Sequence, residues 1–311
     1  MMTGIKILGT GMYVPQKVIT NDDLSKLVAT SDEWISTRTG MKERHYAAEN
    51  EGTTFMAKQA AEQAIINAGI DRSKVGAVVV ATVSADNYAP STAALMQREL
   101  NLEKEIIAID VNAGCSGFIF GLQTLRGLLM TTEKDYGLLI ASETLSRKMD
   151  MTDRSTCVLF GDGAAAMVIR LDENKFFKAI TGVESDDEMI NIKVPNGKIH
   201  MDGQATYKFA VATVPRLIEK IVADSALTPE QIDHYILHQA NLRIIDSIAQ
   251  RLKQPMDKFE VNIEKYGNTS AVSVGLVMAE VDKKGIFKDK DMLLLCAFGA
   301  GKTYGAIVLE W

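Results

Sequence analysis

One pattern occurs in each half of this chain of 311 residues. Phe160-Gly161-Asp162-Gly163 leads into the apolar run 164–169, and Phe298-Gly299-Ala300-Gly301 leads, slightly later, into the apolar run 306–309. Both glycine-containing stretches follow a segment that is predicted to be a strand. Self-similarity of this kind indicates that one α/β unit has been duplicated within the chain.

The two halves also match further upstream. Cys115 follows the predicted strand end at Thr82 at nearly the spacing at which Asn268 follows the predicted strand end at His238. Each of the two later residues lies in a glycine-containing turn before an apolar helical pattern. If the halves are equivalent, Cys115, His238 and Asn268 should meet where the halves join, which is a usual place for a site.

Short apolar segments with strand character alternate with helical patterns along the whole chain. This alternation predicts an α/β fold with helices on both faces of its sheets, divided into halves at residues 1–172 and 173–311. The predicted strands are 76–83, 136–141, 156–160, 234–238, 292–297 and 304–309, and the predicted helices are 91–100, 116–130, 211–226 and 242–252.

Composition and charge argue against several classes of protein. Hydrophobic residues make up 47% and charged residues 24%, as in ordinary globular proteins, and a net charge of −6 argues against nucleic-acid binding. The apolar runs are too short to cross a bilayer and the first residues lack the features of a signal peptide, so we expect no membrane insertion and a cytoplasmic location. The three cysteines and four histidines show no paired metal-ligand spacing, which predicts free thiols and no metal.

Cys115 is the first candidate for chemistry, because small residues surround it and a predicted helix follows it. A thiol at a helix N-terminus faces unpaired N–H groups and the positive end of the helix dipole, which stabilise the nucleophilic thiolate. The segment fits a small buried core cysteine equally well, since free cysteine is often buried. For Cys157 and Cys296, within predicted apolar strands, burial in the core is the favoured interpretation.

His238 and Asn268 could complete a reactive group. A histidine at the carboxyl end of a strand points toward the usual ligand crevice of an α/β fold, although taken alone it fits a hydrogen-bonded structural histidine slightly better. Asn268 could equally be a turn residue. A thiol, an imidazole and an amide together make a nucleophile with two hydrogen-bond donors, and the glycines around Ala300 would let backbone N–H groups approach an oxyanion. The other histidines, His45, His200 and His234, are expected to be exposed or locally paired.

Taken together, these residues resemble ketoacyl-acyl-carrier-protein synthase III, one of the thiolase-fold condensing enzymes. The resemblance covers nearly the whole chain in the family's order, and the ordered set is far more specific than any single motif. The matching stretches are Thr30-Ser31-Asp32-Glu33-Trp34-Ile35, Thr37-Arg38-Thr39-Gly40, Cys115-Ser116-Gly117-Phe118, Thr152-Asp153-Arg154, Phe160-Gly161-Asp162-Gly163-Ala164, His238-Gln239-Ala240-Asn241, Tyr266-Gly267-Asn268-Thr269-Ser270 and Ala297-Phe298-Gly299-Ala300-Gly301.

The resemblance implies a five-layered αβαβα fold of two duplicated halves that works as a homodimer. It also implies a decarboxylating condensation of an acyl-CoA primer, with acetyl-CoA expected, and malonyl-acyl carrier protein. Coenzyme A enters as a thioester substrate, and no separate cofactor is expected. Cys115 resembles the acylated nucleophile, His238 and Asn268 its partners, and the backbone N–H groups of Cys115 and Ala300 the oxyanion hole.

The remaining implied roles concern substrate binding. The residues that match coenzyme A or pantetheine contacts are Trp34, Arg38, Arg154, Gln204 and Asn241. Phe298 and Ala89 match positions that line the active site, and Lys208 and Arg243, with the neighbouring Arg251 and Lys253, match a basic docking face for the acidic carrier protein. Without the resemblance, the basic residues of the helix predicted at 242–252 would be assigned to an ordinary solvated face.

A few positions depart from the family pattern. Gln204 replaces a commonly seen asparagine, and Lys302 and Tyr304 replace an apolar residue and a tryptophan. Ala89 stands where some relatives carry a bulky aromatic residue, so we expect room for a longer or branched primer.

Other activities remain open from the residues alone. A papain-like hydrolase also uses cysteine, histidine and asparagine in this chain order, but the local signature around its cysteine is absent. A thiolase would need a second catalytic cysteine, a hydroxymethylglutaryl-CoA synthase-like reaction would favour a glutamate in the site, and a catalytically silent scaffold would not need an intact Cys–His–Asn set.

Overall fold

Two β-sheets of matching topology form the centre of the molecule in the computed structural model, which describes residues 3–193 and 197–311. Going from β1 to β4 and from β8 to β11, successive neighbours are antiparallel, antiparallel and parallel. A parallel bridge between Tyr235 and Phe259 stands where β5 stands in the first sheet. The first sheet runs in the order β1 (Gly4–Tyr13), β7 (Gly163–Asp172), β6 (Tyr136–Glu143), β4 (Val75–Ala81) and β5 (Ile107–Val111), and the second in the order β8 (Phe177–Val183), β13 (Thr303–Glu310), β12 (Met292–Gly299) and β11 (His234–Leu237).

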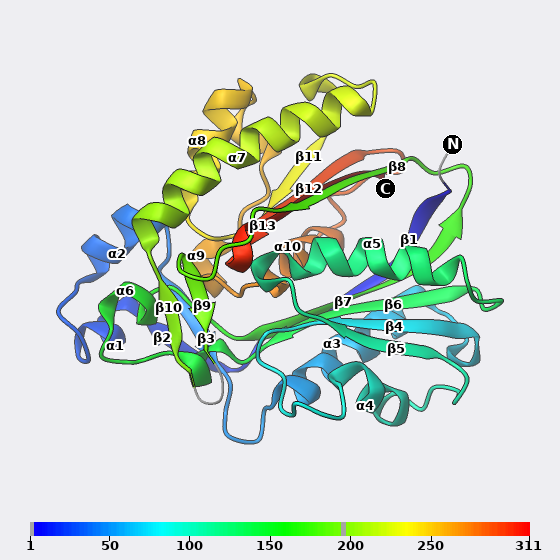
Figure 1. Cartoon of the computed structure of the whole chain (residues 1–311), viewed down its shortest axis with the longest axis horizontal. Helices are drawn as coiled ribbons and strands as arrows, with labels where there is room; N and C mark the ends of the chain where they lie inside the picture. Colours follow the sequence, from blue (N-terminus) through cyan, green and yellow to red (C-terminus); the bar gives the residue numbers. More distant parts are fainter. Residues whose placement is uncertain (1–2, 194–196) are drawn as a thin grey trace.

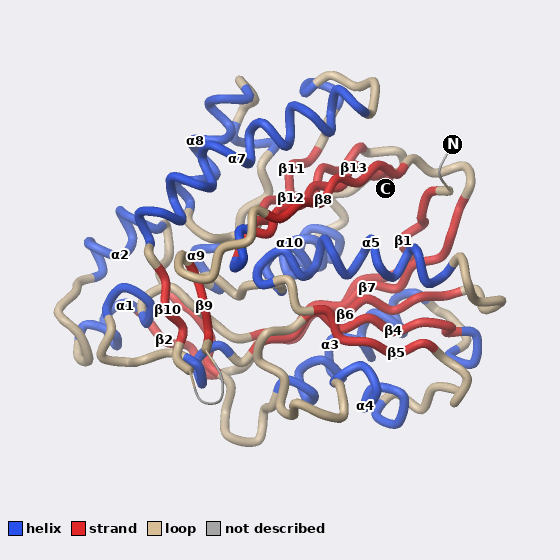
Figure 2. The backbone as a smooth tube through the Cα atoms, viewed as in Figure 1, coloured by secondary structure: helices blue, strands red, loops and turns tan. Residues whose placement is uncertain are grey.

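The helices form three layers around these sheets (Figures 1 and 2). The middle layer holds one helix from each half, α5 (Gly117–Leu129) and α10 (Val272–Lys283), and contacts both sheets. The outer layers are α3 (Thr53–Ala68) with α4 (Thr92–Glu99) on the first sheet and α7 (Gly203–Asp224) with α8 (Leu242–Leu252) on the second. The predicted five-layered αβαβα fold of two duplicated halves is confirmed.

Strand β4 shows why the sequence folds into layers. All seven of its residues, VGAVVVA, are buried, as expected of a parallel strand covered on both faces. Val79 packs into the core that contains α5, whereas Val78 and Val80 pack into the core under α3 and α4. Successive side chains of a strand point to opposite faces, so one short valine-rich segment joins two hydrophobic cores.

The remaining elements surround the ends of the sheets nearest the site. Within the described residues, no helix is both long and apolar enough to cross a membrane. The predicted division between residues 172 and 173 falls at the end of β7 and stays a prediction.

The short elements are α1 (Asn21–Ser25), α2 (Asp32–Thr39), α6 (Arg154–Cys157), α9 (Ile263–Tyr266), β2 (Lys17–Thr20), β3 (Glu43–Tyr46), β9 (Ile190–Ile192) and β10 (Ile199–Met201), with short 3₁₀ turns between them.

One predicted strand, 156–160, is wrong. Its first half belongs to helix α6, because the Asp153 carboxylate accepts hydrogen bonds from the Ser155 N–H and the Thr156 hydroxyl and caps the helix. Cys157 therefore lies in a helix rather than a strand, although it is fully buried as expected. Only Phe160 makes a strand-like bridge, with Asn268.

Candidate active site

Cys115 lies in a 3₁₀ turn, Gly114–Ser116, between the carboxyl end of β5 and the first residue of α5. Gly114 has a φ of +54°, which a residue with a side chain adopts only with strain. The turn directs Cys115 toward the boundary of the two halves, and the side chain is 9% exposed.

His238 follows β11, and its backbone N–H donates to the Cys296 carbonyl at 2.8 Å. The residue is 3% exposed, and the Phe298 ring packs edge-on against the imidazole with 5.6 Å between the ring centroids. Nδ1 is buried and has no hydrogen-bond partner in the described part of the chain. Packing against Phe298, rather than a hydrogen bond to Nδ1, therefore holds the imidazole ring.

Asn268 lies between α9 and α10, and its side chain is oriented by its own turn. The Asn268 Oδ1 atom accepts a hydrogen bond from the Ser270 N–H at 2.9 Å. Its backbone is fixed as well, because its N–H donates to the Leu159 carbonyl and its carbonyl accepts from the Gly161 N–H. With the oxygen occupied, the amide Nδ2 is the group left to donate a hydrogen bond to a ligand.

Two cavities meet at Cys115. The first, which we call the Trp34 cavity, measures about 580 Å³ and is lined by Cys115, His238, Asn268 and Phe298 at one end and by Trp34 and Arg38 among others. The second, the Leu145 cavity, measures about 530 Å³. Cys115, Phe160 and Ile190 line both cavities, so the thiol stands between two compartments.

The turns that carry Cys115 and Ala300 pack directly against each other. A Cβ atom added to Gly299 would lie 2.6 Å from the Cys115 backbone nitrogen, and one added to Gly114 would lie 3.0 Å from the Ala300 backbone nitrogen. The Thr303 hydroxyl lies 3.0 Å from the carbonyl oxygens of both Ala113 and Ala300, where it can donate to either. This packing brings the two N–H groups predicted to form an oxyanion hole close to the thiol.

Burial controls the charge of the site. It raises the pKa of the Cys115 thiol to about 11, against a hydrogen bond from the Ser270 side chain that lowers it. The expectation that the thiolate would be favoured is therefore wrong as a net effect, because loss of hydration is the largest influence on this pKa. Burial also lowers the pKa of His238 to about 3, so the resting site holds a neutral thiol and a neutral imidazole at neutral pH.

Two guanidinium groups lie over the ring of Trp34, which lines the Trp34 cavity. The Arg38 and Arg154 groups lie 4.7 and 4.8 Å from the indole centroid, within range of cation–π attraction. Arg38 and Trp34 line the cavity, whereas Arg154 is not among its lining residues and donates to the Ala29 carbonyl.

The other predicted substrate contacts are spread over the same cavity. Gln204 lines it, and so does Asn241, whose Oδ1 caps α8 by accepting from the Arg243 N–H while its Nδ2 donates to the Arg38 carbonyl. Ala89 is exposed and lines neither cavity, although Asn87 and Tyr88 of the same loop line the Leu145 cavity.

The predicted basic residues divide into two groups. Arg243 lines the Trp34 cavity at the first turn of α8, with its guanidinium 5.9 Å from the ring of Tyr207, the neighbour of Lys208. Arg251 and Lys253 are exposed at the other end of α8, about 12 Å further along at 1.5 Å per residue. The structure therefore places Arg243 at this cavity and Lys208 beside it, in a neighbouring hollow that acidic residues also line, whereas the other two lie farther away.

The remaining cysteines and histidines lie where core and structural residues are expected. Cys296 is buried in β12, and all three cysteines are free. His234 lies between Glu260 and Asp291, at 2.8 and 3.2 Å, and His200 is exposed. Among the described residues, no group of three or more histidine, cysteine, aspartate or glutamate side chains could hold a metal ion.

Sequence reasoning missed several residues that shape the site. Ser270 bonds to Cys115, Thr303 joins the two turns, and Leu145 and Ile190 line the cavities. The clearest signal that could have been used is Glu143, a charged residue two positions after the apolar strand predicted at 136–141, because a carboxylate is rarely buried without a specific role.

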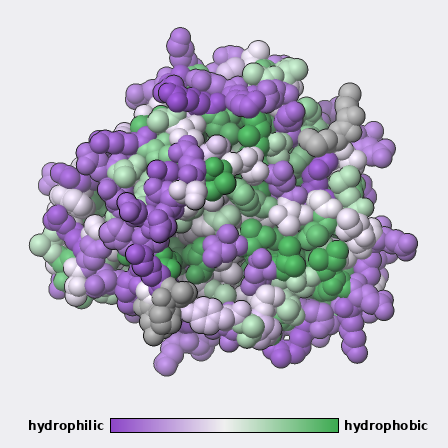
Figure 3. All heavy atoms as spheres, in the orientation of Figure 1, coloured by the Kyte–Doolittle hydropathy of each residue, from purple (hydrophilic) through white to green (hydrophobic). Residues whose placement is uncertain are grey.

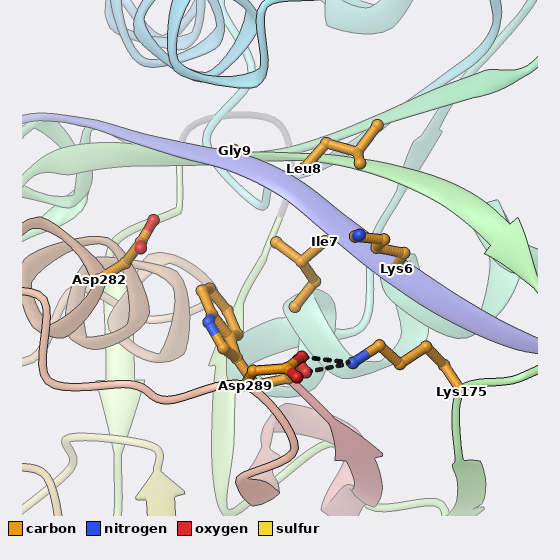
Figure 4. Close-up of a pocket in the computed structure, with 8 residues that line it drawn as sticks. Lys6, Ile7, Leu8, Gly9, Lys175, Asp282 and Asp289 are labelled. Atoms are coloured by element: carbon orange, nitrogen blue, oxygen red, sulfur yellow. Dashed lines mark hydrogen bonds and ion pairs between the residues drawn. The ribbon is translucent and has the colours of Figure 1, made fainter.

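A third hollow, of about 200 Å³, lies beside β1 and contains neither Cys115 nor its partners (Figure 4). Lys175 at its rim pairs with Asp289 and Glu310, at 3.4 and 3.2 Å, and donates to the Trp311 backbone oxygen. These bonds join the last residues of the chain to the turn between β7 and β8.

Comparisons with known proteins agree with this geometry. The family model of 3-oxoacyl-[acyl-carrier-protein] synthase III matches residues 109–185, and the model of its C-terminal part matches residues 222–311. The chain is similar to beta-ketoacyl-[acyl-carrier-protein] synthase III of Clostridium acetobutylicum, with 41% identity over 100% of this chain and 99% of that protein. It is equally similar, at 41% identity over 99% of this chain and 100% of the relative, to the protein of that name from Aquifex aeolicus.

Solved structures are similar over their whole length. The 3-oxoacyl-[acyl-carrier-protein] synthase III of Aquifex aeolicus has a TM-score of 0.95 and 40% identity, covering 99% of this chain and 100% of that one. The synthase III of Thermus thermophilus has a TM-score of 0.93 and 38% identity, covering 98% of each chain.

Proposed function

Because this chain belongs to the 3-oxoacyl-[acyl-carrier-protein] synthase III family, we propose that Cys115, His238 and Asn268 carry out the two half-reactions of that enzyme. The activity is that of an acyltransferase, which condenses an acyl group with malonyl-acyl carrier protein and releases carbon dioxide, as the first condensation of fatty acid synthesis. We propose acetyl-CoA as a primer and no separate cofactor, with coenzyme A acting as a thioester substrate. Free thiols fit a reducing compartment, and we propose the cytoplasm.

In the first half-reaction the sulfur of Cys115 attacks the carbonyl carbon of an acyl-CoA whose pantetheine arm occupies the Trp34 cavity. The N–H groups of Cys115 and Ala300 donate to the oxyanion of the tetrahedral intermediate. The carbon–sulfur bond to coenzyme A then breaks. The departing thiolate takes up the proton that Cys115 has lost, and the acyl chain remains in the Leu145 cavity.

In the second half-reaction malonyl-acyl carrier protein loses carbon dioxide in the emptied Trp34 cavity. The electron pair of the broken bond forms an enolate, and His238 and the Asn268 Nδ2 donate hydrogen bonds to its oxygen. The enolate carbon attacks the acyl-Cys115 carbonyl and releases the 3-ketoacyl product. Cys115 leaves as a thiolate and takes up a proton from water. The acyl-Cys115 intermediate thus divides one difficult reaction into two easier steps, which is the advantage of covalent catalysis.

The meeting of two cavities at Cys115 carries this proposal, because each half-reaction needs the acyl chain on one side of the sulfur and a pantetheine arm on the other. The test is steady-state kinetics with both substrates varied, for which we expect the parallel double-reciprocal lines of a ping-pong reaction. Intersecting lines would contradict the proposal, and cleavage of a fluorogenic peptide would favour the hydrolase instead. The glutamate needed for a hydroxymethylglutaryl-CoA synthase-like reaction is not found among the residues that line either cavity.

Arg243, which lines the Trp34 cavity, and Lys208, which lies beside it, are proposed to receive the acidic carrier protein. The double charge reversal Lys208→Glu with Arg243→Glu should raise KM for malonyl-acyl carrier protein at least about tenfold at low salt, because steering and docking depend on charge. Arg251→Glu with Lys253→Glu, at the far end of α8, changes the net charge equally, is the matched control and should change KM much less. An equal effect of the control would show that net charge, rather than this face, matters.

We also propose a homodimer joined at the edge strand β5. Ile109 in its middle is 37% exposed, and apolar atoms gather over α5 and this edge of the first sheet (Figure 3). An exposed apolar strand edge is a ready partner for another strand. Sedimentation equilibrium should give a dimer that Ile109→Lys weakens; a monomeric wild-type protein would contradict the proposal.

A further inference from the structure

Glu143 is a fully buried carboxylate that the condensation does not use. It is the last residue of β6 and has 0% exposure. It lines neither the Trp34 cavity nor the Leu145 cavity, so it does not touch the substrate. A buried carboxylate is costly unless its oxygens are hydrogen-bonded, and its partners therefore indicate what it holds in place.

Three consecutive residues donate hydrogen bonds to this carboxylate. The Val83 N–H lies 3.1 and 3.2 Å from its two oxygens, and the Thr82 hydroxyl lies 3.2 Å from Oε2. The Ser84 hydroxyl also donates to Oε2, while its oxygen accepts from the Thr144 N–H at 2.9 Å. Glu143 thus fastens the segment 82–84 to the end of β6.

The fastened segment begins one wall of the Leu145 cavity. Thr82 and Val83 line this cavity together with Cys115, and the chain continues along it through residues 85–88. A second carboxylate secures the other end of the wall, because Asp86 accepts hydrogen bonds from the Thr53 and Thr54 N–H groups at 2.9 and 2.7 Å. The position of the wall beside the thiol therefore depends on Glu143 at one end and Asp86 at the other.

No cation neutralises Glu143 among the described residues, and the titratable groups that act on its charge are Cys115 from the 3₁₀ turn and Asp162 before β7. Burial raises the pKa of Glu143 to about 7, against the hydrogen bonds from Ser84, Val83 and Thr82, which favour the ionised form. Below this pH the carboxyl group carries a proton and can no longer accept from all of its donors. The wall should then be held less firmly.

We propose that Glu143 is a positioning residue that fixes the segment 82–84 and thereby sets which acyl primers Cys115 accepts. This inference rests on the proposed function, since it takes the Leu145 cavity to receive the acyl chain. A firmly held wall favours short primers, and a loosened wall admits longer ones. Primer preference should accordingly shift toward longer chains as the pH falls from 8 to 6.

The test measures the rate at which Cys115 becomes acylated by each member of a series from acetyl-CoA to octanoyl-CoA, followed by intact mass at pH 6 and pH 8. In Glu143→Gln the octanoyl-to-acetyl ratio at pH 8 should rise by about tenfold, the size expected for loss of a hydrogen bond to a charged group. The ratio should also lose its dependence on pH. Decarboxylation of malonyl-acyl carrier protein, which does not use this wall, should stay within about twofold of wild type.

Two further variants separate positioning from general stability. Tyr235→Phe removes the hydrogen bond from a buried hydroxyl to the Pro229 carbonyl in the second half of the molecule, away from segment 82–84, and it should keep the wild-type ratio at both pH values. Ser84→Ala keeps the carboxylate but removes one of its donors, and it should raise the octanoyl-to-acetyl ratio as Glu143→Gln does. It therefore tests the inference even if Glu143→Gln fails to fold.

Two results would overturn the inference: an unchanged ratio in both Glu143→Gln and Ser84→Ala, or a fall of acylation and decarboxylation by one common factor. Failure of the wild-type protein to become acylated by any primer would instead contradict the proposed function, so the two failures can be distinguished.

Discussion

Replacing His238 by alanine should lower the decarboxylation of malonyl-acyl carrier protein about 10²- to 10³-fold, the usual effect of removing one donor to a developing oxyanion. The neutral imidazole, buried against Phe298, can donate to the enolate oxygen without carrying a charge of its own. Release of labelled carbon dioxide from carboxyl-labelled malonyl-acyl carrier protein measures this step directly.

The same variant should still become acylated by acyl-CoA, because that half-reaction needs only the sulfur and the two backbone donors. His200→Ala, which removes an exposed histidine, is the control and should leave both steps unchanged. Loss of acylation with intact decarboxylation in His238→Ala would reverse the roles assigned to Cys115 and His238.

The pH dependence of decarboxylation follows from the same burial. An ordinary histidine would gain a proton as the pH falls through about 6.5, but burial lowers the pKa of His238 to about 3. The imidazole therefore stays neutral between pH 7 and pH 5. The decarboxylation rate of the wild-type protein should therefore show no inflection near pH 6.5 that depends on His238. An inflection there in wild type that disappears in His238→Ala would contradict this prediction.

Gly299→Ala should reduce acylation of Cys115 by about 10²- to 10³-fold, as expected when one oxyanion donor is misplaced. The added Cβ atom would lie 2.6 Å from the Cys115 nitrogen and 2.9 Å from the Cys115 Cβ atom, so the two turns would have to separate. The initial rate of coenzyme A release, measured with a thiol reagent, checks this prediction.

Gly127→Ala is the matched control for this substitution. A Cβ atom there would meet nothing within 4 Å, and Gly127 lies inside helix α5, where alanine is the better helix former. The control should keep full acylation. If Gly299→Ala retained wild-type acylation, the N–H groups of Cys115 and Ala300 could not be the oxyanion donors.

The sequence predicted the fold well because its signals are periodic and local. The valine run of β4 and the repeated glycine turns predicted an α/β fold of two duplicated halves, whereas the five layers were implied by the resemblance to the synthase family. The strand predicted at 156–160 was wrong because one capping side chain, Asp153, outweighed the apolar character of the residues after it. Local chemistry of this kind competes with hydrophobic pattern over short segments.

The candidate site was only partly predictable. Cys115, His238 and Asn268 could be named because each stands at the end of an element in equivalent positions of the two halves. The raised pKa of Cys115 could not be predicted, since it results from burial by distant residues. Contacts such as those of Thr303 with Ala113, or of Glu143 with Thr82, join residues far apart in the sequence and leave no periodic signal.

The most direct test of the account is the intact mass of the protein after incubation with acetyl-CoA alone. Wild-type protein should gain one acetyl group, which proteolysis and sequencing place on Cys115, and Cys115→Ser should gain none. An acetyl group that persists in Cys115→Ser, or a wild-type protein that consumes acetyl-CoA without ever carrying its acyl group, would contradict the claim that this sulfur holds the substrate between the two half-reactions.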